Sequence, residues 1–229
     1  MLVFGGGTNQ TWQLSFSGTP TWSTVAVSGT LPPASVQHTT VYDPIHDQMI
    51  LFGGSTAPFS GSARRDAWTL SLSGASTWSK LALGTVPAGR SGMPMVYDSA
   101  RDRLLISGGQ YQGIVTYYFA ETWEYDLSGD AHWNLLASGI DRENMVGIYD
   151  PVRDQMVLFG GQHLIHQAPE EGHFNDVNIL SLSGTPTWTN LTPRGASGRS
   201  RSSCGIYDPV RDRLLVFGAT TTTPCGRYR

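Results

Sequence analysis

The sequence predicts an all-β fold of repeated four-stranded blades, a β-propeller. Each of its seven tryptophans belongs to one of two series with a spacing of 55 or 56 residues, and short apolar runs recur at the same period without helical periodicity. The first series is Trp12, Trp68 and Trp123, with Asn178 in fourth place, and the second is Trp22, Trp78, Trp133 and Trp188.

Length and charge exclude several classes of protein. The 229 residues are 39% hydrophobic, which suffices for the core of one domain. A net charge of −3 gives no basic surface, so we expect no nucleic-acid partner. The chain has no apolar run long enough for a membrane helix, and residues 1–6 lack the basic and apolar regions of a secretion signal.

The second strand of each repeat is an apolar run that ends in two small residues. Met49–Phe52 precedes Gly53-Gly54, and a run of this kind is typical of a strand covered on both faces. The equivalent runs span residues 104–106, 156–159 and 214–217, and in the last copy Ala219 replaces the second glycine.

A Tyr-Asp motif comes before each of these runs. In Tyr42-Asp43-Pro44, the aspartate and proline occupy the first two positions of a type I turn. The aspartate side chain can accept hydrogen bonds from the backbone just ahead, so we expect a hairpin that closes between Tyr42 and Gln48.

The third and fourth strands follow the glycines. Trp68, Leu70 and Leu72 alternate with polar residues, the period of a strand with one dry face. Gly74 supplies the positive φ for the reversal into a short fourth strand that begins near Trp78.

Together these motifs resemble the kelch family. Its repeat couples a Gly-Gly doublet after the second strand to a later aromatic residue and then to a tryptophan. The resemblance covers essentially the whole chain and implies a propeller that serves as a binding scaffold. The matching sets are Gly53-Gly54 with Trp68 and Trp78, Gly108-Gly109 with Trp123 or Tyr125 and Trp133, and Gly160-Gly161 with Trp188.

The repeat count predicts seventeen strands: three complete blades and a partial blade at each end. Because seventeen strands leave one surplus, the chain is either a closed four-bladed ring or, as we favour, a piece of a larger propeller. We expect the isolated chain to associate through exposed blade edges. The predicted divisions are a partial blade over 1–34, blades over 35–88, 89–141 and 142–197, and a partial blade over 198–229.

Candidate ligand-binding residues lie on the face where strand two joins strand three and where strand four leads to the next blade. Tyr111, Tyr117 and Tyr118 follow the second Gly-Gly doublet. Exposed tyrosines can stack on sugar rings, but we favour packing of this segment as an extended edge of its blade.

Arginines recur just ahead of the first strand of successive blades. Arg90 and Arg142 lie seven residues before Tyr97 and Tyr149, and Arg199 or Arg201 lies in the corresponding region of the last blade. They form either a positive patch for a carboxylate or acidic peptide, or, as we favour, structural pairs with neighbouring carbonyls or aspartates. Arg101, Arg153 and Arg211 lie inside the Tyr-Asp turns and are predicted to be scaffold.

A third loop contains His163, His166 and His173, whose imidazoles could bind a divalent metal. Their spacing matches no closed zinc motif, so these histidines remain weak metal candidates and we predict no cofactor. The paired aspartates recur in every unit, which indicates turns and not general acid-base catalysis. We find no catalytic constellation.

Some kelch propellers belong to copper-radical galactose oxidases, which need tyrosine, histidine and a tyrosine-linked cysteine at the metal. No such set can be assigned around Cys204 or Cys225, so an oxidase remnant is the least favoured function. The two cysteines form either one disulfide or two free thiols.

The resemblance therefore implies a non-catalytic scaffold that binds a protein or peptide through its loop face. The alternative is a carbohydrate-recognition module of a secreted protein, so a glycan is a further partner. The Asp-Pro-x-Arg-Asp turns and a single lysine, Lys80, suggest a bacterial source. We slightly favour an extracytoplasmic location.

Overall fold

The structure is a computed structural model in which every regular element among the described residues is a β-strand. It describes residues 1–57, 62–82, 84, 86–129, 132–163, 172–191 and 204–218, and the backbone of 227–228. Within these ranges no helix is long and apolar enough to cross a membrane. The chain divides into two compact units, one of Met1–Ser91 with Tyr111–Thr116 and the other of Gly92–Gln110 with Tyr117–Arg229.

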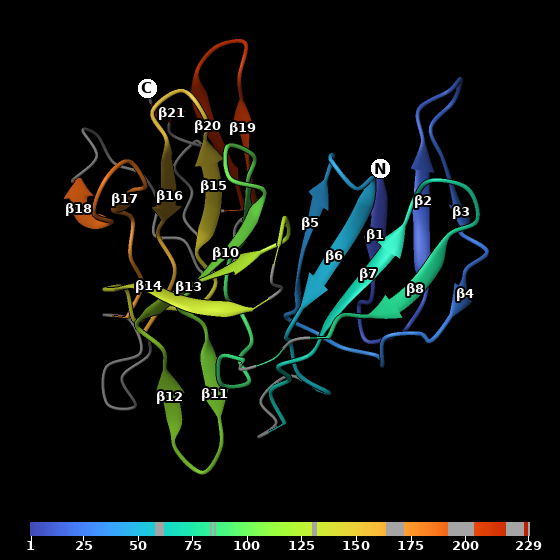
Figure 1. Cartoon of the computed structure of the whole chain (residues 1–229), viewed down its shortest axis with the longest axis horizontal. Coiled ribbons are helices and arrows are strands. Elements are labelled where there is room, and N and C mark those ends of the chain that lie inside the picture. Colours follow the sequence, from blue (N-terminus) through green and yellow to red (C-terminus); the bar gives the residue numbers. More distant parts are fainter. Residues whose placement is uncertain are drawn as a thin grey trace. The chain divides into compact units, whose positions relative to one another are not determined.

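The first unit contains two sheets (Figure 1). One has the order β1-β2-β3, and the other has the order β4-β8-β7-β6-β5, in which only β4 runs parallel to its neighbour. The strands are β1 (Leu2–Phe4), β2 (Thr11–Ser15), β3 (Thr21–Thr24), β4 (Ser28–Gly29), β5 (Thr39–Asp43), β6 (Gln48–Phe52), β7 (Ala67–Ser71) and β8 (Thr77–Lys80).

The second unit contains two four-stranded sheets, β14-β13-β10-β9 and β15-β16-β17-β18, and a sheet in the order β19-β20-β21. A separate hairpin, β11-β12, follows β10 in the chain, and its residues Tyr111–Thr116 belong to the first unit. The strands are β9 (Met95–Asp98), β10 (Arg103–Ser107), β11 (Gln110–Gln112), β12 (Thr116–Tyr118), β13 (Glu121–Asp126), β14 (Trp133–Ser138), β15 (Val146–Asp150), β16 (Gln155–Phe159), β17 (Val177–Ser181), β18 (Thr187–Leu191), β19 (Cys204–Asp208), β20 (Arg213–Phe217) and β21 (Arg227–Tyr228).

The seventeen predicted strands are all present, and the described residues form four further strands. These are β4, β11, β12 and β21. The expectation that the aromatic segment after Gly109 packs as an edge of its blade is wrong, because β11 and β12 pair with each other in a sheet of their own. Antiparallel pairing within the segment satisfies its backbone groups without a place on the blade.

The cores lie between successive sheets. In the first unit Phe4 of β1 packs against Met49, Trp68 and Trp78 of the following sheet. In the second unit Leu105 of β10 and Met156 of β16 share one cluster, and another joins β15–β17 to Leu214 of β20. The second-strand runs of β6, β10 and β16 are covered on both faces, as predicted. The run of β20 is not, because Phe217 at its end is exposed.

The Tyr-Asp turns form as the sequence predicts. The first aspartate, Asp43, accepts from the backbone N–H groups of Ile45 and His46 at 2.9 and 3.2 Å. The second, Asp47, has a φ of 48° and accepts from the Tyr42 hydroxyl at 3.0 Å. The same tyrosine bond joins Tyr97 to Asp102, Tyr149 to Asp154 and Tyr207 to Asp212.

The Gly-Gly doublets allow successive blades to approach closely. Gly108 has a φ of 66°, and a Cβ there would lie 2.4 Å from the carbonyl oxygen of Arg142. The N–H of Gly109 donates to that carbonyl at 2.8 Å. A side chain would both strain the backbone and prevent this contact, so glycine is required on two grounds.

The turn arginines of the second unit connect neighbouring sheets. Arg101 reaches across to Asp154, with Nη1 and Nη2 donating at 2.7 and 2.5 Å, and Arg153 binds Asp212 at the same distances. These contacts explain the predicted scaffold role of Arg101 and Arg153. Each arginine binds the aspartate of the next turn, and not the aspartate that follows it directly in the sequence. These pairs hold the pKa of Asp154 below its usual range and that of Asp212 at about 2, because each carboxylate accepts from an arginine.

Candidate functional site

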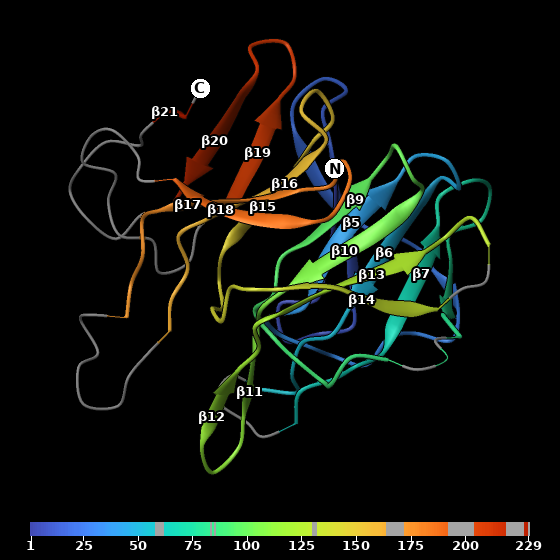
Figure 2. The same cartoon turned by 60° about the vertical axis from the view of Figure 1, so that its left-hand side comes forward.

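The loops between second and third strands carry most of the candidate residues. The β11-β12 hairpin occupies such a loop between β10 and β13, and its residues Tyr111–Thr116 belong to the first unit. Figures 1 and 2 both show β11 and β12 side by side as one hairpin. At its turn Ile114 is fully exposed and Val115 is 72% exposed. Two exposed apolar side chains at the turn of this hairpin favour contact with another molecule.

The three candidate tyrosines differ in their surroundings. Tyr111 and Tyr117 are exposed, and Tyr117 also packs edge-on against the buried Phe119 with ring centroids 5.0 Å apart. Tyr118 stacks on His163 with ring centroids 4.1 Å apart. Tyr111 and Tyr117 therefore offer accessible aromatic surface, whereas Tyr118 supports the loop beside it.

The histidines of the third loop have contacts of their own. Nδ1 of His163 lies 2.9 Å from the backbone oxygen of Asp141 and 3.2 Å from its carboxylate. His173 is buried and its backbone pairs with Gln162, while His166 lies outside the described residues. The proposed metal site thus remains a prediction from the sequence.

The recurrent arginines are placed for structural pairing. Arg142 donates to both carboxylate oxygens of Asp176 and lies over the Phe174 ring, its guanidinium carbon 3.4 Å from the centroid. Arg90 is 1% exposed, and its Nε donates to Ala88 at 3.2 Å. Arg199 and Arg201 lie outside the described residues. The structural alternative therefore accounts for the contacts of Arg142.

A buried carboxylate that the sequence does not single out follows Arg142. Glu143 is 2% exposed, and Gln162 Nε2 donates to its Oε1 at 2.8 Å. Burial raises the pKa of Glu143, and the Gln162 and Asn144 side chains oppose that effect. Ser91 and Val36 hold the equivalent positions, so the repeat pattern gives no signal for this acid.

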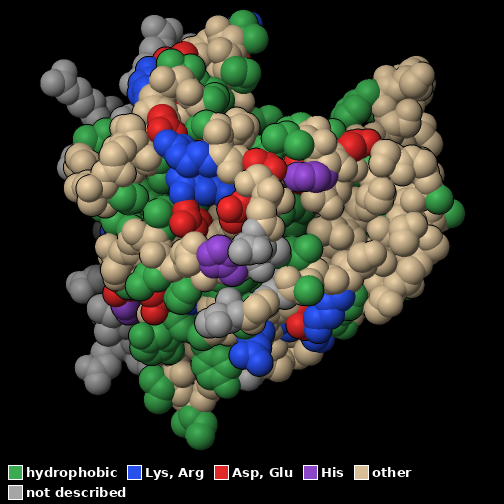
Figure 3. All heavy atoms as spheres, in the orientation of Figure 1, with side chains coloured by type: hydrophobic (Ala, Val, Ile, Leu, Met, Phe, Trp, Pro, Cys, Tyr) green, Lys and Arg blue, Asp and Glu red, His purple; other side chains and the backbone are tan. Residues whose placement is uncertain are grey.

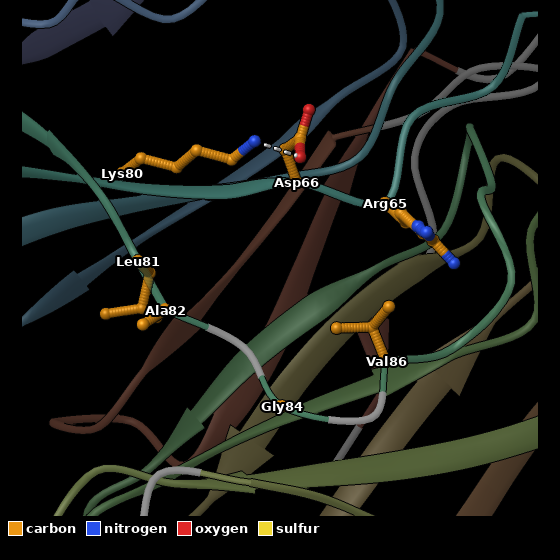
Figure 4. Close-up of a pocket in the computed structure, with 7 residues that line it drawn as sticks. All are labelled: Arg65, Asp66, Lys80, Leu81, Ala82, Gly84 and Val86. Carbon is orange, nitrogen blue, oxygen red and sulfur yellow. Dashed lines mark ion pairs between the residues drawn. The ribbon is translucent and has the colours of Figure 1, made fainter.

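The first unit contains an open pocket of about 640 Å³. Figure 4 shows Arg65 and Val86 on one side of it, Leu81 and Ala82 on the other, and Lys80 reaching toward Asp66. Lys80 Nζ lies 2.7 Å from Asp66 Oδ1 and 5.6 Å from the centre of the Trp68 ring. The pocket thus combines two cations, Arg65 and Lys80, with apolar side chains of the segment that follows strand β8.

Sequence reasoning missed this pocket, although two signals exist. Asp66 corresponds to Asp176, which Arg142 binds, but Ser35 takes the arginine position in this blade. Lys80, the chain's single lysine, binds Asp66 instead. Arg65 is exposed at the end of the preceding loop. Only the fold shows that these residues border the same hollow.

A second cavity, of about 170 Å³, lies between β15–β17 and β19–β20. Gln155 and Ile179 line it, and they stand where the preceding blade has Arg103 and Glu124, which form an ion pair. The cavity is therefore explained by smaller side chains at an interface between sheets, and it contains no unpaired charge that would select a ligand.

Charges of opposite sign mostly lie side by side. On the face drawn in Figure 3, Lys and Arg side chains gather next to Asp and Glu, which agrees with the ion pairs of the turn arginines. An arginine or lysine without an acidic neighbour among the described residues is therefore a candidate for binding an external anion.

Comparisons with known proteins agree with this architecture. Among solved structures the chain is similar to YjhT, with a TM-score of 0.71 at 15% identity over 95% of this chain and 68% of that chain. At this identity the similarity shows the fold, a β-propeller. The family model described as the KLHDC2/KLHL20/DRC7 kelch-repeats domain matches residues 1–219. The chain therefore belongs to the kelch-repeat family.

Proposed function

We propose that the protein is a non-catalytic scaffold that binds a protein or peptide through the face carrying its long inter-strand loops. The observation that carries this proposal is the separate β11-β12 hairpin with its exposed turn residues Ile114 and Val115. Kelch-repeat propellers generally act in protein interaction, which supports the same conclusion.

The hairpin suits a contact element for physical reasons. Its strands pair with each other, so a partner need not supply backbone hydrogen bonds to hold its shape. Tyr111 and Tyr117 add aromatic surface that can be buried with little loss of side-chain entropy. Apolar and aromatic side chains of this kind contribute most of the free energy at protein interfaces.

The proposal is tested by peptide selection. Random peptides displayed on phage are selected on the immobilised chain, and their affinities are measured for the purified wild type and two variants. We expect Val115→Asp to weaken binding by about tenfold or more, because a charge replaces an apolar contact. Val152→Asp is the matched control, since Val152 is 71% exposed at the β15–β16 turn.

The control variant should bind like the wild type, and both variants should keep the wild-type melting temperature. Equal binding by Val115→Asp and the wild type would remove the hairpin from the interface. If no selected peptide binds the purified chain in solution, the scaffold proposal itself fails.

The exposed tyrosines support a second candidate, carbohydrate recognition. Tyr117 is 58% exposed and Tyr111 39% exposed, so their rings are accessible to the C–H faces of a sugar. A glycan array separates the two functions. Binding to a glycan that is lost in Tyr117→Ala, with no peptide binding, would favour this candidate over the peptide scaffold.

A further inference from the structure

Most arginines in the described part of the chain have protein partners, and two that lack a carboxylate partner lie at the open pocket or next to it. Within the described part of the chain Arg64 and Arg65 have no carboxylate partner, and the buried Nε of Arg64 has no hydrogen bond. Arginines that contact an aspartate or glutamate are Arg101, Arg103, Arg142, Arg153, Arg211 and Arg213.

The pocket region therefore has an excess of positive charge. The pocket is lined by two cations, Arg65 and Lys80, and by one carboxylate, Asp66. Arg64 precedes Arg65 in the sequence and adds a third positive charge, although the net charge of the whole chain is −3. Lys80 is held at Asp66 by a 2.7 Å contact, so the exposed guanidinium of Arg65 is available to an external anion. Its planar donors match a carboxylate in a two-point contact.

The rest of the pocket is apolar. Leu81, Ala82 and Val86 belong to the segment that leaves β8; Figure 4 shows Leu81 and Ala82 across the hollow from Arg65, and Val86 on the same side as Arg65. An opening of about 640 Å³ has room for several side chains of an extended chain. Positive charge next to apolar wall selects a ligand with a carboxylate and an adjacent aliphatic side chain.

We infer that this pocket binds an acidic segment of a peptide in which an aliphatic residue neighbours the carboxylates. Arg65 is the anion-binding residue, Leu81 and Val86 accept the aliphatic side chain, and Asp66 sets the affinity by partly neutralising the site. This inference deepens the proposed scaffold function and rests on it, since the ligand is again a peptide.

The probe is a pair of fluorescent peptides blocked at both ends, one containing Glu-Leu-Glu and the other Gln-Leu-Gln. Fluorescence anisotropy with the full chain should show tighter binding of the glutamate peptide, by about threefold to fivefold for each charge that is contacted. The difference should shrink at high salt, because exposed ion pairs are screened. Equal affinities for the two peptides would overturn the inference.

Variants locate the binding site. Arg65→Gln should weaken binding of the glutamate peptide by about threefold to fivefold. Arg65→Lys should weaken it less, because lysine keeps the charge but not the two-point contact. Asp66→Asn should strengthen binding, because it removes the carboxylate that competes with the ligand, and a purely structural role of Asp66 would not produce this gain. Arg211→Gln is the matched control at an exposed arginine of the other unit, and it should bind like the wild type.

The two proposals fail separately. If phage-selected peptides depend on Val115 while Arg65→Gln leaves the glutamate peptide unaffected, the scaffold stands and the pocket inference fails. If the glutamate peptide depends on Arg65 while no selected peptide depends on Val115, the pocket stands and the hairpin is not the contact element. If the Asp66→Asn variant does not fold, the inference is tested by the two Arg65 variants alone. It stands if Arg65→Gln weakens binding of the glutamate peptide more than Arg65→Lys does, and it fails if neither variant weakens binding.

Discussion

At the scale of single residues, His38 shows how a side chain fastens two sheets together. Its Nε2 lies 3.2 Å from the backbone oxygen of Phe4, and the two rings meet edge-on with centroids 5.5 Å apart. A Cβ on Gly5 would lie 2.4 Å from the imidazole, so the glycine makes room for it. Burial lowers the pKa of His38, and the backbone oxygens of Phe4 and Ser35 oppose that effect.

This lowered pKa predicts a loss of stability in mild acid. The pKa of the imidazole in the unfolded chain is about 6.5, so around and below that pH the unfolded chain binds the proton more strongly than the folded chain does. The urea midpoint should therefore fall between about pH 7.5 and about pH 5.5, and His38→Gln should reduce that fall. His132→Gln, at an exposed histidine, is the control. An unchanged pH dependence in His38→Gln would contradict the prediction.

The sequence indicates some residue roles and not others, for a clear reason. The turn aspartates and the Gly-Gly doublets are predictable because their roles depend on local backbone conformation, such as the positive φ of Asp47 and Gly108. The roles of His38, Glu143 and Arg65 depend on neighbours from other segments. Only Ser35, where other blades have arginine, hints that Asp66 needs another partner.

At the scale of elements, the Tyr-Asp turns join successive sheets of the second unit. Arg101 contacts the buried Asp98 of its own turn, Asp154 of the next turn and the backbone oxygen of Leu182. Arg211 occupies the same turn position, yet its ion pair among the described residues is with Asp208 of its own turn, at 3.3 Å. Arg101 thus joins two successive turns, whereas the described ion pair of Arg211 lies within its own turn.

This contrast predicts different costs for the same substitution. Arg101→Gln should lower the free energy of unfolding by about 1–2 kcal/mol, because it removes cross-sheet bonds and a donor to a buried carboxylate. Arg211→Gln should change it by less than about 0.5 kcal/mol, since its pair is exposed. Urea denaturation followed by tryptophan fluorescence measures both. Equal effects would show that the cross-sheet contacts do not stabilise the fold.

The strands themselves are largely predictable, and the additions to them are not. Alternation and apolar runs locate the strands of each sheet because these patterns report burial on one or two faces. The β11-β12 hairpin escapes that reasoning, since its residues are stabilised by pairing with each other and several stay exposed. Strand β4 is only two residues long, and its parallel pairing with β8 leaves no repeat signal.

At the scale of the whole molecule, the repeat allows equivalent positions to be compared from sheet to sheet. Phe217 of β20 is 78% exposed, whereas its equivalents Phe52 and Phe159 are 0% and 8% exposed. Ile206 of β19 is 66% exposed, and its equivalent Val96 is 4% exposed. The β19-β20 sheet therefore presents apolar side chains at positions where the equivalents Phe52, Phe159 and Val96 are buried.

Such a surface predicts self-association that depends on concentration. Sedimentation velocity over about a tenfold concentration range, with reductant present to keep the exposed thiol of Cys204 from forming disulfides, should show an increasing average mass. Phe217→Ser should reduce this association, because it removes a large apolar contact. Val210→Ser is the matched control, since Val210 is 85% exposed but lies in the β19–β20 turn and not on the sheet. A monomer at every concentration, or association that survives Phe217→Ser, would show that this sheet is not the contacting surface.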